Sequence, residues 1–223
     1  MGVGHAAVAL GAAKAAPRLS AGWLVFAAFL ADFLLGIFAM LGVEQAHVPA
    51  DYASRHYLTF TFPYSHGLVP LLLWGALLGF LVSRTQRPDR RRIFLVVAAV
   101  VLSHFLLDGL VHVAGLPVAG ENSPKLGLGL WRHMPLELTL ETLMAIAGVV
   151  IYLGVAGPGA SAWSRWGIPV YMAFVCALTW TQLWMTKPPD PTQLVPSWIG
   201  GTLLFGVAAY VLDRKRTGRA QTA

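Results

Sequence analysis

The chain contains a succession of apolar runs, several of which reach or approach the length that crosses a lipid bilayer. About 20 apolar residues span the hydrocarbon core as a helix. Backbone groups in lipid must be satisfied internally, and the alternating strands of a membrane barrel are absent from this sequence. We therefore predict an all-α, polytopic membrane bundle that forms a single domain over residues 1–223. The expected spans are about 20–42, 66–83, 93–115, 135–155, 168–186 and 198–212.

The composition agrees with a membrane protein and excludes several other classes. Hydrophobic residues make up 57% of the chain and charged residues 12%, against about 45–50% and 25% in soluble domains. The net charge of +6 comes from short basic clusters between the apolar runs, so the predicted partner is the lipid bilayer and not nucleic acid. The single cysteine, Cys176, excludes a disulfide framework and a Cys-based zinc site.

The distribution of basic residues predicts the orientation in the membrane. With the N-terminus in the cytoplasm, twelve of the sixteen Lys and Arg residues fall in inside segments, as the positive-inside rule requires. We expect both termini to be cytoplasmic and the protein to lie in a bacterial-type inner (plasma) membrane. Residues 1–19 are too short an apolar segment for a span and are predicted to form an interfacial or re-entrant lead-in. The sequence does not indicate an oligomeric state.

Acidic residues inside the apolar runs are the most informative polar feature. Four of the ten acids lie within predicted spans: Asp32, Asp108, Glu137 and Glu141. A carboxylate at the centre of a span costs about 2.5–3.5 kcal/mol on insertion scales, and no Lys or Arg shares the spans to pair with it. These carboxylates must be protonated, hydrated or bound to a cation.

Histidines accompany these acids at helical spacing. Two predicted spans carry polar side chains at positions i, i+4 and i+8, which lie along one face of a helix. The two stripes are His104, Asp108 and His112, and His133, Glu137 and Glu141. Because the two helices run in opposite directions, we expect both stripes in the outer half of the bilayer, together with His66 at the mouth of the second span and Asp32 near the middle of the first.

Imidazole and carboxylate groups without a thiolate suit a divalent metal, with zinc favoured and iron or manganese as alternatives. The predicted metal ligands are His66, His104, Asp108 and Asp32. Of the remaining polar residues, Glu137 or Glu141 is predicted as the general base, and His112 or His133 as a group that stabilises developing charge. For Asp32, His104 and Asp108 the alternative is a plain packing role as hydrogen-bonding groups between helices. For His112 it is a position near the interface, and for His133, Glu137 and Glu141 it is a solvated helix end.

Part of the chain resembles a known family. Residues 102–108, with Ser103-His104 and Asp108, followed by Gly115-Leu116-Pro117, resemble the Ser-His-x-x-x-Asp and Gly-x-Pro stretch of the YdjM-like membrane-bound metal-dependent hydrolases. Ser65-His66 and Gly4-His5 are similar to that family's second His motif and its N-terminal Gly-His. The resemblance covers about residues 1–120 and implies metal-dependent hydrolysis in an inner membrane. The residues alone place His5 at the interface, and the resemblance adds it to the possible ligands.

These observations predict an integral-membrane metal-dependent hydrolase that acts on a lipid-like or amphiphilic substrate. Two other functions stay open at the level of sequence. One is a small cation- or proton-coupled transporter or permease, in which the same groups bind a cation or relay protons. The other is a haem- or quinone-binding membrane protein with axial histidines.

Overall fold

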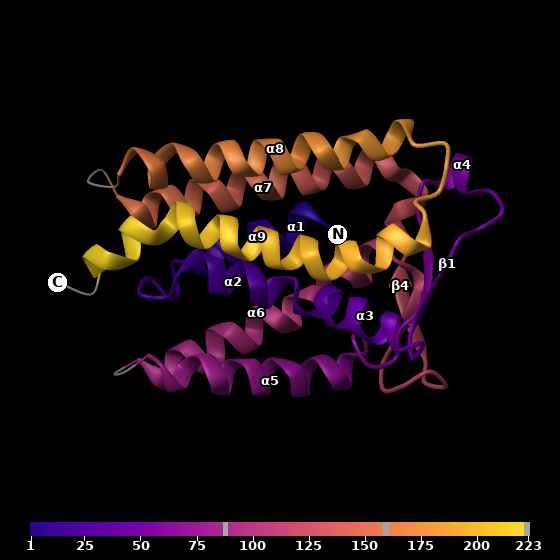
Figure 1. Cartoon of the computed structure of the whole chain (residues 1–223), viewed down its shortest axis with the longest axis horizontal. Coiled ribbons are helices and arrows are strands. Elements are labelled where there is room, and N and C mark those ends of the chain that lie inside the picture. Colours follow the sequence, from indigo (N-terminus) through magenta and orange to yellow (C-terminus); the bar gives the residue numbers. More distant parts are fainter. Residues whose placement is uncertain (87–88, 158–160, 221–223) are drawn as a thin grey trace.

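Long helices run side by side along the molecule, and short strands gather at one end (Figure 1). The computed structural model describes residues 1–86, 89–157 and 161–220. The α-helices are α1 (Val3–Ala12), α2 (Ala21–Ala28), α3 (Leu30–Met40), α4 (Tyr52–Arg55), α5 (Leu68–Arg84), α6 (Arg90–Val111), α7 (Met134–Ala156), α8 (Ile168–Trp180) and α9 (Pro191–Ala220). Shorter helical turns cover Leu130–His133, Trp163–Gly167 and Thr181–Trp184. The mainly helical architecture confirms the predicted all-α class.

Several apolar helices could span a membrane. Within the described residues, three helical segments are long and apolar enough, namely Arg90–Val111, Leu130–Ala156 and Thr192–Asp213. Helices α2 and α3 meet at a bend of 52° and provide a fourth if they are counted as one broken span. Because α5 has 17 residues and α8 has 13, the predicted total of six full spans is not confirmed.

The ends of two predicted spans were wrong. The span predicted over 93–115 ends at Val111, because His112 adopts an extended backbone and Val113–Pro117 forms strand β3. The span predicted over 198–212 belongs to a helix that already begins at Pro191 and contains Pro196. Neighbouring helices allow proline inside membrane helices, so α9 continues through Pro196.

Two antiparallel strand pairs lie at one end of the described bundle. Strand β1 (Gln45–His47) pairs with β2 (Thr59–Thr61), and β3 pairs with β4 (Lys125–Leu128). Helix α9 runs to the opposite end of the bundle (Figure 1). The strand pairs therefore mark one end of the bundle, at which the apolar runs are interrupted.

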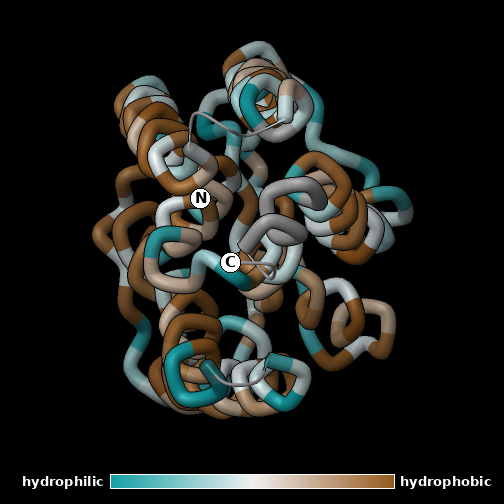
Figure 2. The backbone as a smooth tube through the Cα atoms, turned by 90° about the vertical axis from the view of Figure 1, so that its left-hand side faces the viewer, coloured by the Kyte–Doolittle hydropathy of each residue, from teal (hydrophilic) through white to brown (hydrophobic). Residues whose placement is uncertain are grey.

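Large apolar side chains cover the outside of the helices, as a lipid environment requires. Examples with half or more of the side chain exposed are Leu73, Leu143, Ile146, Val150 and Leu204. Figure 2 looks along the bundle and shows hydrophobic positions along the helices, with hydrophilic positions gathered in turns. This exposure is the reverse of a soluble surface.

Helix α1 begins inside the bundle and not at its surface. Val3 and His5 are 1% exposed, and α1 packs closely on α7, where a side chain at Gly148 would come within 2.5 Å of the Ala7 carbonyl oxygen. The segment after α1 reaches the start of α6, where Arg18 pairs with Asp89 at 3.2 Å. The 10 residues of α1 thus penetrate only part of the bundle, as a re-entrant helix does, and they carry His5 into its interior.

Candidate metal centre

Asp108 stands at the centre of a buried group of imidazoles. The Nε2 atoms of His104, one turn earlier on α6, and of His112, the residue that follows α6, both lie 3.3 Å from its Oδ2. His5 Nε2 lies 3.1 Å from the other oxygen, Oδ1, and His66 Nε2 lies 3.8 Å from Oδ2. The helical spacing that suggested one polar face therefore does bring His104, Asp108 and His112 together.

The orientation of His104 depends on the bend between α2 and α3. The Nδ1–H of His104 donates to the carbonyl oxygen of Ala28 at 2.7 Å. Ala28 is the last residue of α2, and the final carbonyls of a helix lack a partner within the helix. A carbonyl can only accept, so Nδ1 holds the hydrogen, and in the neutral ring Nε2 presents a lone pair toward Asp108. Histidine ligands of metals usually have this arrangement, with the second ring nitrogen donating to a carbonyl or carboxylate.

His66 enters from the loop before α5 and meets His104. Their Nε2 atoms are 3.2 Å apart, and His66 Nδ1 lies 2.8 Å from Ser65 Oγ. The loop is fixed by Glu44, whose Oε1 accepts hydrogen bonds from the backbone N–H groups of Tyr64 and Ser65 at 2.7 and 2.9 Å. Glu44 lies between α3 and β1, is 1% exposed and acts as a buried support for the His66 segment.

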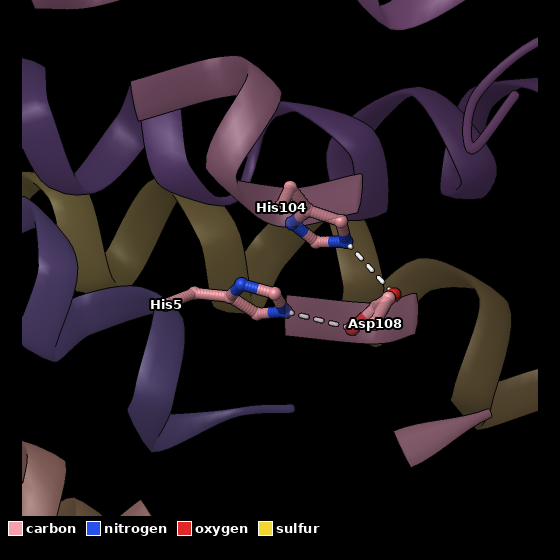
Figure 3. Close-up of side chains that lie close together, drawn as sticks. All are labelled: His5, His104 and Asp108. Atoms are coloured by element: carbon pink, nitrogen blue, oxygen red, sulfur yellow. Dashed lines mark hydrogen bonds and ion pairs between the residues drawn. The ribbon is translucent and has the colours of Figure 1, made fainter. Parts of the chain in front are cut away.

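His5 completes the group from α1. Its ring stacks on that of His104 with 3.8 Å between centroids and 4° between planes. Figure 3 shows both rings directing a nitrogen toward Asp108 from separate helices. The interface position that the residues alone suggested for His5 was wrong, because α1 inserts into the bundle. The N-terminal Gly-His was the sequence signal that pointed to it.

Two overlapping triads could each hold a metal ion. The first is His5, His104 and Asp108, all buried, and the second is Asp32, His66 and His104. In each triad one ligand atom per residue lies within 4.8 Å of the others. The four predicted ligands are therefore shared between the triads, and a buried His/Asp cluster with a capacity for metal is present. The amino group of Met1 also lies 2.9 Å from Asp108 Oδ1, a positive partner that a search for Lys and Arg did not include.

A small cavity opens beside the cluster. It has a volume of about 170 Å³. Its lining combines acids, imidazoles and aromatic rings: Met1, Gly2, His5, Asp32, Leu35, Phe60, Phe62, His66, Asp108, His112, Trp131 and Trp198. The Asp32 side chain is 26% exposed and lies 3.6 Å from His66 Nε2, so it is the most accessible carboxylate of the cluster.

The polar stripe of α7 serves a different purpose. Both oxygens of Glu141 are occupied by backbone N–H groups at the start of α1, with Gly2 N at 2.8 Å from Oε1 and Val3 N at 2.6 Å from Oε2. Glu137 is 2% exposed. His133 is exposed and lines a separate pocket. None of these three is among the described residues that line the cavity beside Asp108. The predicted general bases on α7 are therefore not part of the described lining of this cavity.

No known protein family, curated protein or solved structure matches this chain.

Proposed function

We propose that the protein is a membrane-embedded metal-dependent hydrolase, with zinc as the favoured metal and an amphiphilic molecule as substrate. The observation that carries the proposal is the state of His104, whose Nδ1–H is taken by the Ala28 carbonyl while Nε2 faces Asp108 at 3.3 Å. A histidine that only packed between helices would not need a carboxylate and further imidazoles around its second ring nitrogen. These groups fit a divalent metal.

The first triad suits a catalytic metal better than the second. His5, His104 and Asp108 are 1–3% exposed, and three protein ligands leave an open position for water or substrate. A bound divalent metal supplies Lewis acidity and lowers the pKa of water. His66 then remains to support the site through Ser65.

Asp32 takes the place of the predicted bases on α7. It lines the cavity and is the most exposed carboxylate of the cluster, whereas the oxygens of Glu141 are engaged by α1. Asp32 accepts the proton of the attacking water, and His112, which also lines the cavity, donates to the oxygen that gains charge.

The size and surroundings of the cavity support an amphiphile over a haem. About 170 Å³ is below the range of about 300–1,000 Å³ that encloses a whole small organic ligand. The cavity can therefore admit a reacting group, while the rest of the substrate stays outside it. Exposed apolar side chains cover the neighbouring helices, where the hydrophobic part of such a substrate can lie.

Metal analysis of the purified full chain tests the proposal. In non-ionic detergent, we expect about one transition-metal ion per chain in the wild type and its loss in His104→Ala. The matched control is His47→Ala, because His47 is an exposed histidine that contacts Thr61 in the β1–β2 pair. A wild type that stays metal-free after exposure to zinc, manganese and iron would contradict the proposal, as would a His104→Ala variant that keeps its metal.

Catalysis is tested separately with Asp32→Asn. We expect this variant to retain the metal of the first triad but to hydrolyse ester- or phosphodiester-containing amphiphiles at least a hundredfold more slowly, as loss of a general base does. Unchanged turnover in Asp32→Asn would remove Asp32 from the reaction. Metal without turnover on any such amphiphile in the wild type would contradict hydrolysis itself.

A further inference from the structure

A second, larger cavity lies at the end of the bundle that carries the strands. It has a volume of about 550 Å³, which is within the range of small-molecule sites. We call it the outer pocket. Its lining comes from α4, from the turn before α7 and from the turn after α8: Ser54, Arg55, His56, Tyr57, Trp131, Arg132, Met134, Pro135 and Leu183.

The outer pocket is positively charged. Arg55 and Arg132 both line it, and no acidic residue is among the described residues of the lining. Arg55 pairs with Asp51 through Nε and donates from one terminal nitrogen to the Tyr57 hydroxyl at 3.3 Å. Arg132 has no ion pair with any other residue in the described part of the chain, so its charge is not balanced within the pocket. A guanidinium binds a phosphate through two parallel hydrogen bonds, which makes Arg a common phosphate ligand.

His56 is held in the pocket at a cost in backbone conformation. It has φ 60° and ψ 19°, and it is the one non-glycine residue with positive φ among those the structure describes. Its Nδ1 lies 3.0 Å from the carbonyl oxygen of Met185, so Nδ1 carries the hydrogen and Nε2 is left for another partner. Strained residues of this kind gather at binding sites, where the surrounding structure enforces them.

Trp131 connects the outer pocket to the metal cluster. It lines both cavities. Its ring stacks on Tyr57 at 5.7 Å and 24°, and it contacts His112 with 4.1 Å between ring centroids. Trp131 therefore forms part of the wall of both the outer pocket and the cavity beside Asp108. Leu183 lines the pocket, and Trp184 and Met185, which follow it in the chain, have exposed side chains, so this segment offers apolar side chains to a hydrophobic tail.

We propose that the outer pocket binds a phosphate group carried by the head group of a lipid. Arg132 and Arg55 pair with the phosphate oxygens, His56 lines the pocket beside them, and the tail lies on the apolar side chains of Leu183, Trp184 and Met185. The assignment of this lipid as the substrate rests on the proposed function, because it places the reacting group in the cavity beside Asp108. The binding of the phosphate itself does not depend on a metal.

Equilibrium binding of radiolabelled phosphatidic acid to the full chain in maltoside detergent tests the proposal. We expect saturable binding that Arg132→Gln weakens at least tenfold, since a charge-assisted, bidentate pair is lost. Arg132→Lys keeps the charge and should recover only part of the affinity. The control is Lys125→Gln, which removes a cation from β4 that is already paired with Glu121 at 2.8 Å, and it should bind as the wild type does.

Competitors distinguish the source of the phosphate. Diacylglycerol and a fatty acid of the same chain length should fail to displace the probe, and inorganic phosphate should displace it only at much higher concentration than unlabelled phosphatidic acid. Displacement by the fatty acid would overturn the assignment to phosphate. Displacement by inorganic phosphate at the same concentration as unlabelled phosphatidic acid would overturn the lipid source. A loss of affinity in Lys125→Gln as large as that in Arg132→Gln would show that binding depends only on the overall positive charge, and would overturn the outer pocket as the site.

The metal-free His104→Ala variant separates this proposal from the proposed function. We expect it to bind phosphatidic acid with the wild-type affinity, because His104 does not line the outer pocket. If the wild-type protein binds phosphatidic acid but never takes up metal, the proposed hydrolase function is contradicted and the proposed phosphate site is supported. Loss of binding in His104→Ala, with the fold intact by circular dichroism, would overturn the independence of the outer pocket.

Discussion

Helices α6 and α7 carry polar side chains at the same spacing, but these side chains have different roles in the two helices. On α6 the three members of the stripe are buried and meet in one cluster, with Asp108 between two imidazoles at 3.3 Å. On α7 the acids are buried, but Glu141 accepts from the backbone of α1, and His133 faces outward. A polar stripe inside a membrane helix therefore predicts that polar side chains make buried contacts, but it does not predict which partners they contact.

The partner that each stripe meets explains the difference. The α6 stripe faces the bend after α2, the loop that carries His66 and the ring of His5, all of which offer nitrogen ligands or support for them. The α7 stripe faces the first turn of α1, whose N–H groups lack partners within their own helix and attract negative charge. Glu141 thus positions α1, and α1 positions His5 in the cluster.

Asp108→Asn should show the largest effect and tests the α6 half of this comparison. Asn keeps the shape but removes the charge to which four imidazole nitrogens lie within 3.8 Å. We expect metal content to fall below about one tenth of the wild-type value, while the protein still inserts, since a buried charge has been removed. Metal content and the yield from washed membranes measure the two effects. An Asp108→Asn protein with full metal content would assign the ion to the second triad.

Glu141→Gln should show an intermediate effect and tests the α7 half. The amide has one acceptor oxygen, so backbone N–H groups of α1 are left without a charged partner. We expect a loss of about 2 kcal/mol in stability and a partial loss of metal, because His5 is no longer held while His104 and Asp108 remain. Thermal unfolding in detergent and metal analysis measure both. The control is Glu121→Gln, which removes an exposed acid paired with Lys125. Wild-type stability in Glu141→Gln would deny that Glu141 positions α1.

The fold was predictable where the apolar pattern is continuous. It was not predictable where single tertiary contacts determine the position at which a helix breaks or ends. The apolar runs identify α5 to α9, but the break at Phe29 occurs without a Gly or Pro in the sequence around it. Helix α6 continues through Gly109 and ends at Val111, because the residues that follow it form β3, which pairs with β4. Both departures affect the cluster. The carbonyl oxygen of Ala28, at the break, accepts a hydrogen bond from His104, and His112 follows directly after the end of α6.

The site was predictable to the same degree. His66, His104, Asp108 and Asp32 were found because acids and imidazoles are costly in lipid and shared the predicted outer half. His5 was underestimated because an isolated histidine in an alanine-rich run carries no spacing signal. Neither Glu44 nor Asp213 was predicted to be buried, because each lies just beyond an apolar run. Asp213 accepts from Ala21 N and from the Tyr152 hydroxyl at 2.7 Å, which are contacts with residues distant in sequence.

His133→Ala should show the smallest effect and marks the limit of the α7 stripe. His133 shares helical spacing with Glu137 and Glu141, but it is exposed and lines a pocket with Leu110, Leu128 and Leu140 instead of the cavity beside Asp108. We expect a change in stability within about 0.5 kcal/mol, as for ordinary surface substitutions, with metal content and turnover unchanged. The comparison with His112→Ala sharpens this expectation, because His112 is 6% exposed and touches both Asp108 and Trp131. A loss of metal or turnover in His133→Ala as large as that in His112→Ala would mean that the two stripes converge in the working protein, and that the assignment of α7 to structural support alone is wrong.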